Sequence, residues 1–367
     1  MTYLFLLIIM LLEFYAIILS IFLYLLYKPD FLNIFFSFGV MLFTFFHIVL
    51  FLFFMSLDLT LNEVLLPLWM LALVSPIILV IILIIISTLL VYFYHNVLGK
   101  DFSNFLDRLE LKANQLSKIK RDTHRKINHI IIFIGLLIVW FIGVYIANFI
   151  TGTNEGMIPE ENNILLVYFK IITKPVLIKE ILFSFGWFYY LLFFFFYIFF
   201  LFILANEFTR KSKIFSFPFN LFPRLYLNDE EKRSYGTYLY FAIGHMFAAF
   251  ICPPMVLFSI LGISSIADLM TSQIGIRFGK RHINWNKNKT WEGTTAGVIV
   301  AFVISFIFIG IIWALIFAVT FLIFDIITNK PLKVSDNLLI PVGTALIYVL
   351  IRFIFNLNYQ IIFFEWI

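Results

Sequence analysis

Charged residues are scarce in this sequence, and their absence from long stretches decides its class. Asp, Glu, Lys and Arg make up 13% of the 367 residues, whereas 63% are hydrophobic. Soluble domains are closer to about a quarter charged and about half apolar. Runs longer than about 18 apolar residues are typical of bilayer spans. The long stretches that contain no charged residue include 64–99, 181–206, 234–267 and 293–324. The sequence therefore predicts an all-α, polytopic integral membrane protein.

Several other features are missing. Cys252 is the single cysteine, so an internal disulfide framework is excluded. The sequence has no G-x-x-x-x-G-K-[ST] phosphate loop, no Cys/His zinc spacing and no G-x-S-x-G elbow. No basic region precedes the first apolar run, so we expect a retained helix instead of a cleaved signal peptide. The net charge of +5 comes from short loops between apolar segments, and we expect no nucleic-acid partner.

The apolar segments predict about ten transmembrane helices. We place them at roughly 3–27, 31–57, 64–94, 130–150, 180–204, 237–261, 263–279, a pair within 294–327 that turns at Gly310, and 338–356. The chain then divides into N-terminal helices of unassigned role (1–95), a cytosolic amphipathic helix (96–129), a catalytic transmembrane domain (130–357) and a C-terminal tail (358–367).

The charged loops indicate an orientation. Basic residues gather in 95–129, 205–236 and 280–293, whereas 58–63 and 151–163 carry acidic residues and no Lys or Arg. Alternating spans bring the basic loops to one side, which the positive-inside rule makes cytosolic. We therefore expect an active site on the cytosolic face, in a membrane that the sequence does not identify.

Two clusters lie at the ends of predicted spans. The first contains Arg125, Lys126 and His129, where two cations and an imidazole could hold a phosphate. Its alternative is a basic cluster that simply stops translocation, with a snorkelling Lys. The second is Glu207 and Arg210, whose i, i+3 spacing permits an ion pair that is more often structural than catalytic.

The third cluster runs from Ala267 to Gly297 and combines a carboxylate inside an apolar segment with a basic loop. Asp268 precedes Gly275 and Gly279, whose G-x-x-x-G spacing is typical of close helix contacts and also permits close approach to a ligand. Lys289 and Glu292 then offer a phosphate contact and a metal ligand or base. A surface loop would explain the lysines, but it would not explain Asp268.

The fourth cluster is Asp336-Asn337, followed by Pro341, at the start of the last predicted span. An Asp-Asn pair can coordinate Mg²⁺ through oxygen atoms. The same pair can cap the helix that follows, which is the more ordinary role.

Taken in order, these clusters resemble the CTP-dependent lipid-alcohol kinases, a family that includes dolichol kinase, phytol kinase and the CTP-using diacylglycerol kinase. The resemblance covers about 121–341 and departs from the family at Ala267, where a Gly is usual, and at Asp325, where a Glu is usual. The matching residues are Arg125, Lys126, His129 and Gly135; Glu207 and Arg210; Glu230, Glu231 and Gly236; Asp268, Gly275, Phe278, Gly279 and Lys280; Lys289, Thr290, Glu292 and Gly293; and Asp336, Asn337 and Pro341.

The resemblance implies a kinase that transfers a phosphoryl group from CTP to a membrane lipid alcohol, with Mg²⁺ as cofactor. Dolichol or another polyprenol, a phytol-like isoprenoid and diacylglycerol all remain open as acceptors, as do UTP or ATP as donors and the oligomeric state. The implied residues are Asp268, Glu292 and His129 for catalysis; Arg125, Lys126, Arg210, Arg277, Lys280, Lys289, Gly275 and Gly279 for nucleotide or phosphate binding; and Asp268, Asp336 and Asn337 for the metal.

Two alternatives stay open. The sequence motif Lys289-Thr290-Trp291-Glu292-Gly293 is closer to the corresponding motif of the phosphatidate cytidylyltransferases, which make a CDP-lipid. The carboxylate cluster that follows this motif in that family is absent here. A transporter or scaffold would use Asp268 and Glu13 as charges along a pathway and would turn over no nucleotide.

Overall fold

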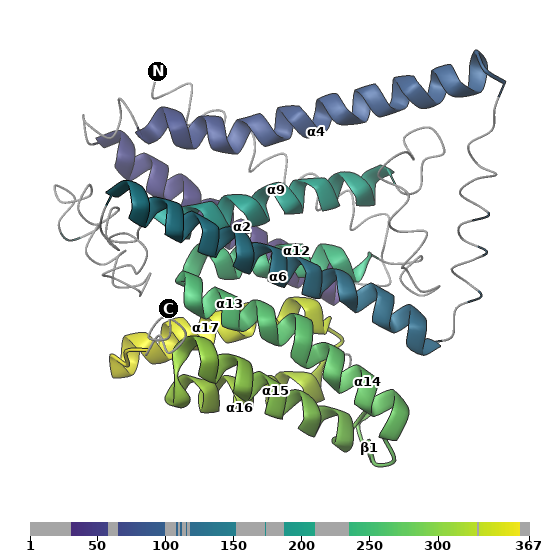
Figure 1. Ribbon diagram of the computed structural model, residues 1–367, viewed down its shortest axis with the longest axis vertical. Coiled ribbons are helices and arrows are strands. Elements are labelled where there is room, and N and C mark those ends of the chain that lie inside the picture. The colour runs from purple at the N-terminus through teal and green to yellow at the C-terminus, as the bar shows by residue number, and fades with distance from the viewer. Residues whose placement is uncertain are drawn as a thin grey trace.

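The computed structural model describes residues 31–57, 65–99, 108, 111, 115, 118–151, 173, 187–209, 235–328 and 330–359. These residues form a helical bundle with one short β-hairpin (Figure 1). The helices are α2 (Phe31–Leu57), α4 (Leu65–Asn96), α6 (Lys118–Thr151), α9 (Trp187–Thr209), α12 (Thr237–Ile251), α13 (Pro254–Gly262), the π-helical turn η3 (Ile263–Ala267), α14 (Asp268–Phe278), α15 (Trp291–Ile309), α16 (Ile311–Ile327) and α17 (Asp336–Phe355). The strands are β1 (His282–Ile283) and β2 (Asn286–Thr290).

The helices have the length and composition of membrane spans. Within the described residues, five helical stretches are long and apolar enough to cross a bilayer, namely Leu66–Asn96, Asp122–Ile146, Pro254–Phe278, Trp291–Ile309 and Asp336–Phe355. Shorter apolar helices cover Phe31–Phe46, Leu192–Glu207, Thr237–Ile251 and Ile311–Ile327. An all-α membrane-embedded protein is thus confirmed in outline, although these helices do not show the predicted total of about ten spans. The first predicted span, 3–27, lies outside the described residues.

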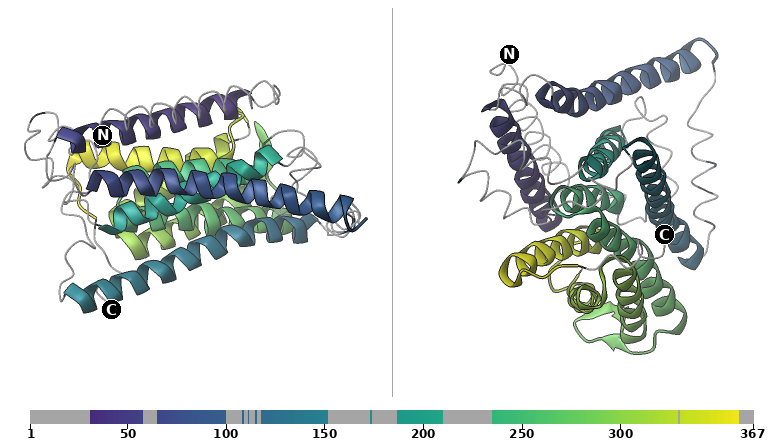
Figure 2. Two further views of the ribbon diagram at one scale, coloured as in Figure 1. Left: turned by 90° about the horizontal axis from the view of Figure 1, so that it is seen from above. Right: turned by 60° about the vertical axis from the view of Figure 1, so that its left-hand side comes forward.

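The α12 and α13 helices form the centre of the bundle. Every residue of α12 after Thr237 is buried, and so is every residue of α13. A helix that is apolar on all sides is expected to be surrounded by other helices. The α2, α9 and α17 helices pack against α12, and α6, α15 and α17 pack against α13. The α4 helix contacts α9 and α2 and lies at the edge of the bundle (Figure 2).

The predicted boundary between the spans 237–261 and 263–279 is wrong. The chain turns ten residues earlier than Gly262, at Cys252 and Pro253, which are both extended. Proline has no N–H to donate, so the helix ends there and restarts with Pro254 at its first position. The chain continues in helical conformation through Gly262, where a Cβ atom would meet Ile304 Cγ2 at 2.8 Å. This glycine therefore permits a close contact between α13 and α15.

Two other predicted boundaries can be compared with the structure. Gly310 separates α15 from α16 with a φ of 83° and a ψ of 173°, which confirms the turn inside 294–327. The α6 helix begins at Lys118, so the end of the predicted amphipathic helix is continuous with the span expected from residue 130. Most of that amphipathic segment lies outside the described residues.

The basic loop after α14 is a β-hairpin, which the sequence did not predict. Its strands pair antiparallel between His282 and Thr290. Trp285 Nε1 donates to the carbonyl of Ile326 at 3.2 Å, and Asn286 Nδ2 donates to the carbonyl of Thr328 at 2.7 Å. These carbonyls lie at the C-terminal end of α16, where helical hydrogen bonding leaves acceptors free. The hairpin is therefore fixed to α16 by side chains that complete this helix end.

Glycine allows α14 and α15 to pack closely beneath the hairpin. A Cβ atom on Gly293 would meet the carbonyl oxygen of Thr271 at 2.5 Å and Gly275 Cα at 3.0 Å. Both neighbours are backbone atoms, so the helices would have to separate to admit a side chain. The contact is thus a small-residue interface of the kind that packs membrane helices.

We expect Gly293→Ala to destabilise the detergent-solubilised protein by about 1–3 kcal/mol, the usual cost of overpacking. The melting temperature, followed by intrinsic tryptophan fluorescence, measures this loss. Gly135→Ala is the matched control, because no atom lies within 4 Å of the added Cβ. That change should be neutral or slightly stabilising, since Ala is the better helix former. Equal melting temperatures for the two variants would contradict the close contact.

Candidate functional site

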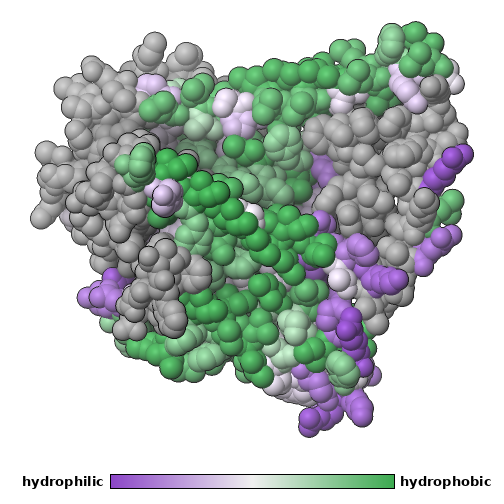
Figure 3. All heavy atoms as spheres, in the orientation of Figure 1, coloured by the Kyte–Doolittle hydropathy of each residue, from purple (hydrophilic) through white to green (hydrophobic). Residues whose placement is uncertain are grey.

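The candidate site lies at one polar end of the bundle. Hydrophilic residues gather at the lower right in Figure 3, over the hairpin, the end of α14 and the start of α6, while hydrophobic residues cover the centre of the same view. The C-terminal end of α9 and the N-terminal end of α6 lie on the same side of the molecule in Figure 1. The described ends of the two helices that border these basic segments therefore lie on one side of the molecule.

Lys126 of α6 and Asp268 of α14 form a buried ion pair. Lys126 Nζ lies 2.8 Å from Asp268 Oδ2 and also donates to the backbone carbonyl of Asp268 at 2.9 Å. Both side chains are less than a tenth exposed. Together the two contacts fix the ammonium group on the first residue of α14. The interaction joins residues 142 positions apart in the sequence.

A π-helical turn immediately precedes Asp268. Residues Ile263–Ala267 form this wider turn, and the N–H of Asp268 bonds to the carbonyl of Ile263. Ser265 Oγ of the turn donates to the backbone carbonyl of His129 at 3.2 Å, so the turn is also attached to α6. Single π turns inside α-helices occur frequently at functional sites. Here the turn changes the helical register just before the buried carboxylate.

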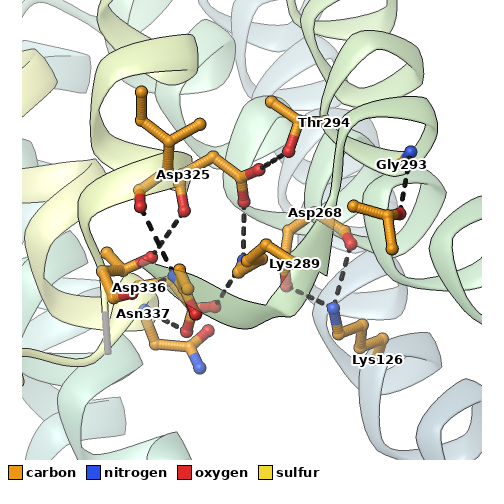
Figure 4. Close-up of polar contacts among 12 residues, drawn as sticks. Lys126, Asp268, Lys289, Gly293, Thr294, Asp325, Asp336 and Asn337 are labelled. Atoms are coloured by element: carbon orange, nitrogen blue, oxygen red, sulfur yellow. Dashed lines mark hydrogen bonds and ion pairs between the residues drawn. The ribbon is translucent and has the colours of Figure 1, made fainter. Parts of the chain in front are cut away.

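Lys289, at the end of β2, lies among three aspartates (Figure 4). Its Nζ atom is 2.6 Å from Asp325 Oδ1 and 3.4 Å from Asp336 Oδ2. Burial alone would lower the pKa of Lys289. The carboxylates of Asp325, Asp336 and Asp268 outweigh burial and raise this pKa well above its usual value. The ammonium group therefore stays protonated throughout the physiological pH range.

Asp336 and Asn337 begin α17 next to Lys289. Asp336 Oδ1 accepts the N–H of Asn337 at 3.0 Å, and Asp336 Oδ2 accepts from Lys289. The carboxylate thus stabilises the helix N-terminus and joins the charged cluster at the same time. Ser335 is the N-cap of α17 and Asp336 is its first residue, so the capping role expected for this pair is wrong, and its Mg²⁺ role stays a prediction.

The cluster as a whole has more acid than base. It contains the ammonium groups of Lys126 and Lys289 and the carboxylates of Asp268, Asp325 and Asp336. The formal charge is therefore one negative unit before any ligand binds. We refer to these five residues as the charged cluster.

Glu292 is held at the hairpin by a different set of contacts. Its Oε2 atom accepts the backbone N–H groups of Lys280 and Arg281 at 3.3 and 3.2 Å, and Oε1 accepts from Arg281 Nε at 3.2 Å. The carboxylate thus fixes the start of the hairpin to the first turn of α15. Arg277 and Lys280 are exposed beside it, where a soluble anion can reach them.

Gly275 and Gly279 face the helix that follows the hairpin. A Cβ on Gly275 would meet Thr290 Oγ1 at 3.1 Å, and one on Gly279 would meet Thr290 Cγ2 at 2.6 Å. Thr290 in turn caps α15 through the N–H of Gly293. Helix packing accounts for both glycines, and their predicted contact with phosphate stays a prediction.

His129 faces the bundle interior. Its ring stacks on Phe241 of α12 with centroids 4.0 Å apart. Of the first predicted cluster, Lys126 is the residue that reaches Asp268. The side chain of Arg125 lies outside the described part of the chain, as does all of Arg210. Glu207 is buried, and Oε1 accepts the hydroxyl of Tyr238 and the N–H of Gly236 at the start of α12.

The described residues contain no group of three or more His, Cys, Asp or Glu side chains spaced to hold a metal ion. Mg²⁺, however, commonly uses one or two carboxylates and completes its shell with water and substrate phosphates. Asp336 is the most exposed carboxylate of the charged cluster, with Asp268 close by. This donor set fits an Mg²⁺ ion that arrives with a nucleotide better than a permanently bound one.

The sequence did not identify Asp325 or Thr294 as site residues. Asp325 Oδ1 binds Lys289, and Asp325 Oδ2 accepts the hydroxyl of Thr294 at 2.6 Å. The available signal was a lone carboxylate at the end of an otherwise uncharged run, 293–324. Thr294 carries no comparable signal, because it looks like any small residue early in a helix.

No protein-family model, curated protein or solved structure matches this chain. The geometry of the charged cluster and the motifs in the sequence therefore carry the functional argument.

We expect Lys126→Met to destabilise the protein by about 3–5 kcal/mol, because it leaves the Asp268 carboxylate buried without its cation. The melting temperature in detergent measures the effect. The control is the double variant Lys126→Met/Asp268→Leu, which removes both charges and should recover most of the stability. A double variant as unstable as the single one would show that the ion pair is not the source of the loss.

Proposed function

We propose that the protein is a membrane-embedded kinase that transfers the terminal phosphoryl group of CTP to a lipid alcohol. The observation that carries the proposal is the convergence of Lys126, Asp268, Lys289 and Asp336. They come from three helices and a strand and meet at the polar end of an apolar bundle. Phosphoryl transfer requires positioning and charge neutralisation more than covalent chemistry by the protein. A mixed cluster of ammonium and carboxylate groups supplies both.

Asp268, Lys126 and Lys289 each have a role in this proposal. Asp268 accepts the proton of the lipid hydroxyl, and Lys126 holds the Asp268 carboxylate in place. Lys289 has three N–H donors, of which two point to Asp325 and Asp336. The third remains for a phosphate oxygen. Arg277 and Lys280, exposed near the hairpin, attract the nucleotide electrostatically.

Asp336 and Asp268 are the residues that would hold Mg²⁺ together with the nucleotide, and Asn337 adds an amide oxygen beside them. When bound, the ion neutralises charge on the phosphates during transfer. The charged cluster alone has a formal charge of one negative unit, so a bound divalent cation would make it positive and would favour an anionic nucleotide.

The position of the cluster suits a lipid acceptor. Asp268 is buried within the apolar span Pro254–Phe278, directly after the uncharged run 234–267, beside helices that expose large apolar side chains. A lipid alcohol places its hydroxyl at the membrane surface and leaves its chain among such side chains. Polyprenols, shorter isoprenoid alcohols and diacylglycerol all meet this requirement.

A dual-label assay tests the reaction. Purified protein in vesicles receives Mg²⁺, a panel of lipid alcohols and CTP labelled at either the α- or the γ-phosphate. We expect only the γ label to enter lipid. Incorporation of the α label with release of pyrophosphate would identify a cytidylyltransferase instead, and no turnover with any alcohol or nucleotide would support a transporter or scaffold.

We expect Asp268→Asn to lower the transfer rate by about 10²–10⁴-fold, the usual contribution of a general base. The measurement is the initial rate of γ-label transfer at saturating CTP and lipid. The melting temperature of the variant is compared with that of the wild type to exclude unfolding. Transfer at the wild-type rate would remove Asp268 from the chemistry.

We expect Lys289→Met to lower kcat/KM for CTP by about 10²–10³-fold, as for other residues that stabilise transition-state charge. Lys287→Met is the matched control, because Lys287 lies on the same strand two residues earlier and is exposed. That variant should keep nearly wild-type kcat/KM. Equal losses in both would mean that the strand contributes only a diffuse positive field.

A further inference from the structure

The geometry points to Asp325, supported by Thr294, as the positioning residue that holds Lys289 in the charged cluster. This inference rests on the proposed function for its meaning, since the Lys289 ammonium is the group proposed to contact phosphate. Its structural part, that Asp325 determines where Lys289 lies, can be tested without any turnover.

Each carboxylate oxygen of Asp325 accepts one short hydrogen bond. One carboxylate oxygen accepts from Lys289 Nζ at 2.6 Å, and the other accepts from Thr294 Oγ1 at 2.6 Å. Lys289 is 0.8 Å farther from Asp336, at 3.4 Å. Asp325 is therefore the principal partner of the ammonium group, and Asp336 is the secondary one.

Asp325 occupies a costly position for a carboxylate. Its side chain is 0% exposed, and it lies in the last turn of α16. Burial disfavours the charge, and the negative end of the helix dipole disfavours it further. A buried ion pair is weak evidence for stability, because apolar side chains of similar volume commonly serve as well. The arrangement is better explained by what it does to Lys289.

The helix hairpin of α15 and α16 brings Thr294 and Asp325 together. Thr294 lies sixteen residues before Gly310 and Asp325 lies fifteen residues after it. At 1.5 Å per residue, both are about 23 Å from the turn and therefore level with each other. Thr294 is fully buried, and its hydroxyl orients the Asp325 carboxylate so that the other oxygen faces Lys289.

Lys289 itself is attached to the protein only at the end of a short strand. Its side chain is 12% exposed, so it lies at the boundary between the cluster and solvent. A lysine side chain has a flexible four-carbon stem and loses considerable conformational entropy when it is held in one conformation. Without Asp325, the ammonium group would be free to turn toward water. Asp325 thus acts on phosphate through Lys289 and does not touch substrate.

The first experiment measures where Lys289 lies, without nucleotide. Folded, detergent-solubilised protein is treated briefly with an amine-acetylating reagent, and the modification of each lysine is followed by mass spectrometry. We expect Asp325→Asn to raise the acetylation rate of Lys289 several-fold, and that of Lys287 to stay unchanged as the internal control. Thr294→Val should give a smaller increase and Thr294→Ser none. Unchanged labelling of Lys289 in Asp325→Asn would overturn the inference.

The second experiment is a double-mutant cycle on γ-label transfer. Asp325→Asn should lower kcat/KM by about 10–100-fold, as the loss of an outer partner of a functional group does. In the Lys289→Met background the same change should cost nothing further. Independent, multiplying losses would show that Asp325 has a general structural role and would overturn the inference.

Lysine acetylation and γ-label transfer distinguish a failure of the proposed function from a failure of the inference about Asp325. A protein without kinase activity would contradict the proposed function, and the labelling experiment would still decide whether Asp325 holds Lys289. If Asp325→Asn does not fold, Thr294→Val against Thr294→Ser decides the same question, because the isosteric change removes only the hydroxyl that orients Asp325.

Discussion

Burying a carboxylate among apolar helices costs several kcal/mol, which a neighbouring cation offsets, and the charged cluster buries two carboxylates. Asp268 has Lys126, and Asp325 has Lys289. Each pair joins elements that are distant in the sequence: α6 to α14, and the hairpin strand β2 to α16. Charge compensation therefore determines which elements meet at the polar end. The same pairs leave exposed groups on the hairpin free to meet a soluble anion.

Close packing makes this compensation possible. Small residues bring α14 and α15 together, so that the hairpin between them is short and Lys289 at its end reaches the carboxylates. Asn286 and Trp285 attach the hairpin to the end of α16. The hairpin thus positions the backbone of Lys289, and Asp325 holds its ammonium group. Neither support alone would place the ammonium group.

Hydropathy predicted the helical class and the turn at Gly310, and a lone charge inside an apolar run marked Asp268. Lys126, Lys289 and Asp336 were predicted from the ordered motifs that carry the resemblance. Asp325 was noted only as the position where the resembled family has Glu and was given no role, because a carboxylate at the end of an apolar run resembles an ordinary helix end. The break at Cys252 was missed although Pro253-Pro254 marks it, because the stretch around it is uniformly apolar and uncharged. The π turn over Ile263–Ala267 has no sequence marker at all, since it arises from packing against α6. The kinase chemistry stays a proposal.

The α16 and α4 helices differ greatly in length. At 1.5 Å per residue, α16, with 17 residues, is about 26 Å long, whereas α4, with 32 residues, is about 48 Å long. The hydrocarbon core of a bilayer is about 30 Å thick. Lipid beside α16 must therefore thin, while α4 must tilt or extend beyond the hydrocarbon. Hydrophobic mismatch would then draw the headgroup layer inward on the side of the charged cluster. Under the proposed function, a lipid hydroxyl there would meet Asp268 without leaving its leaflet.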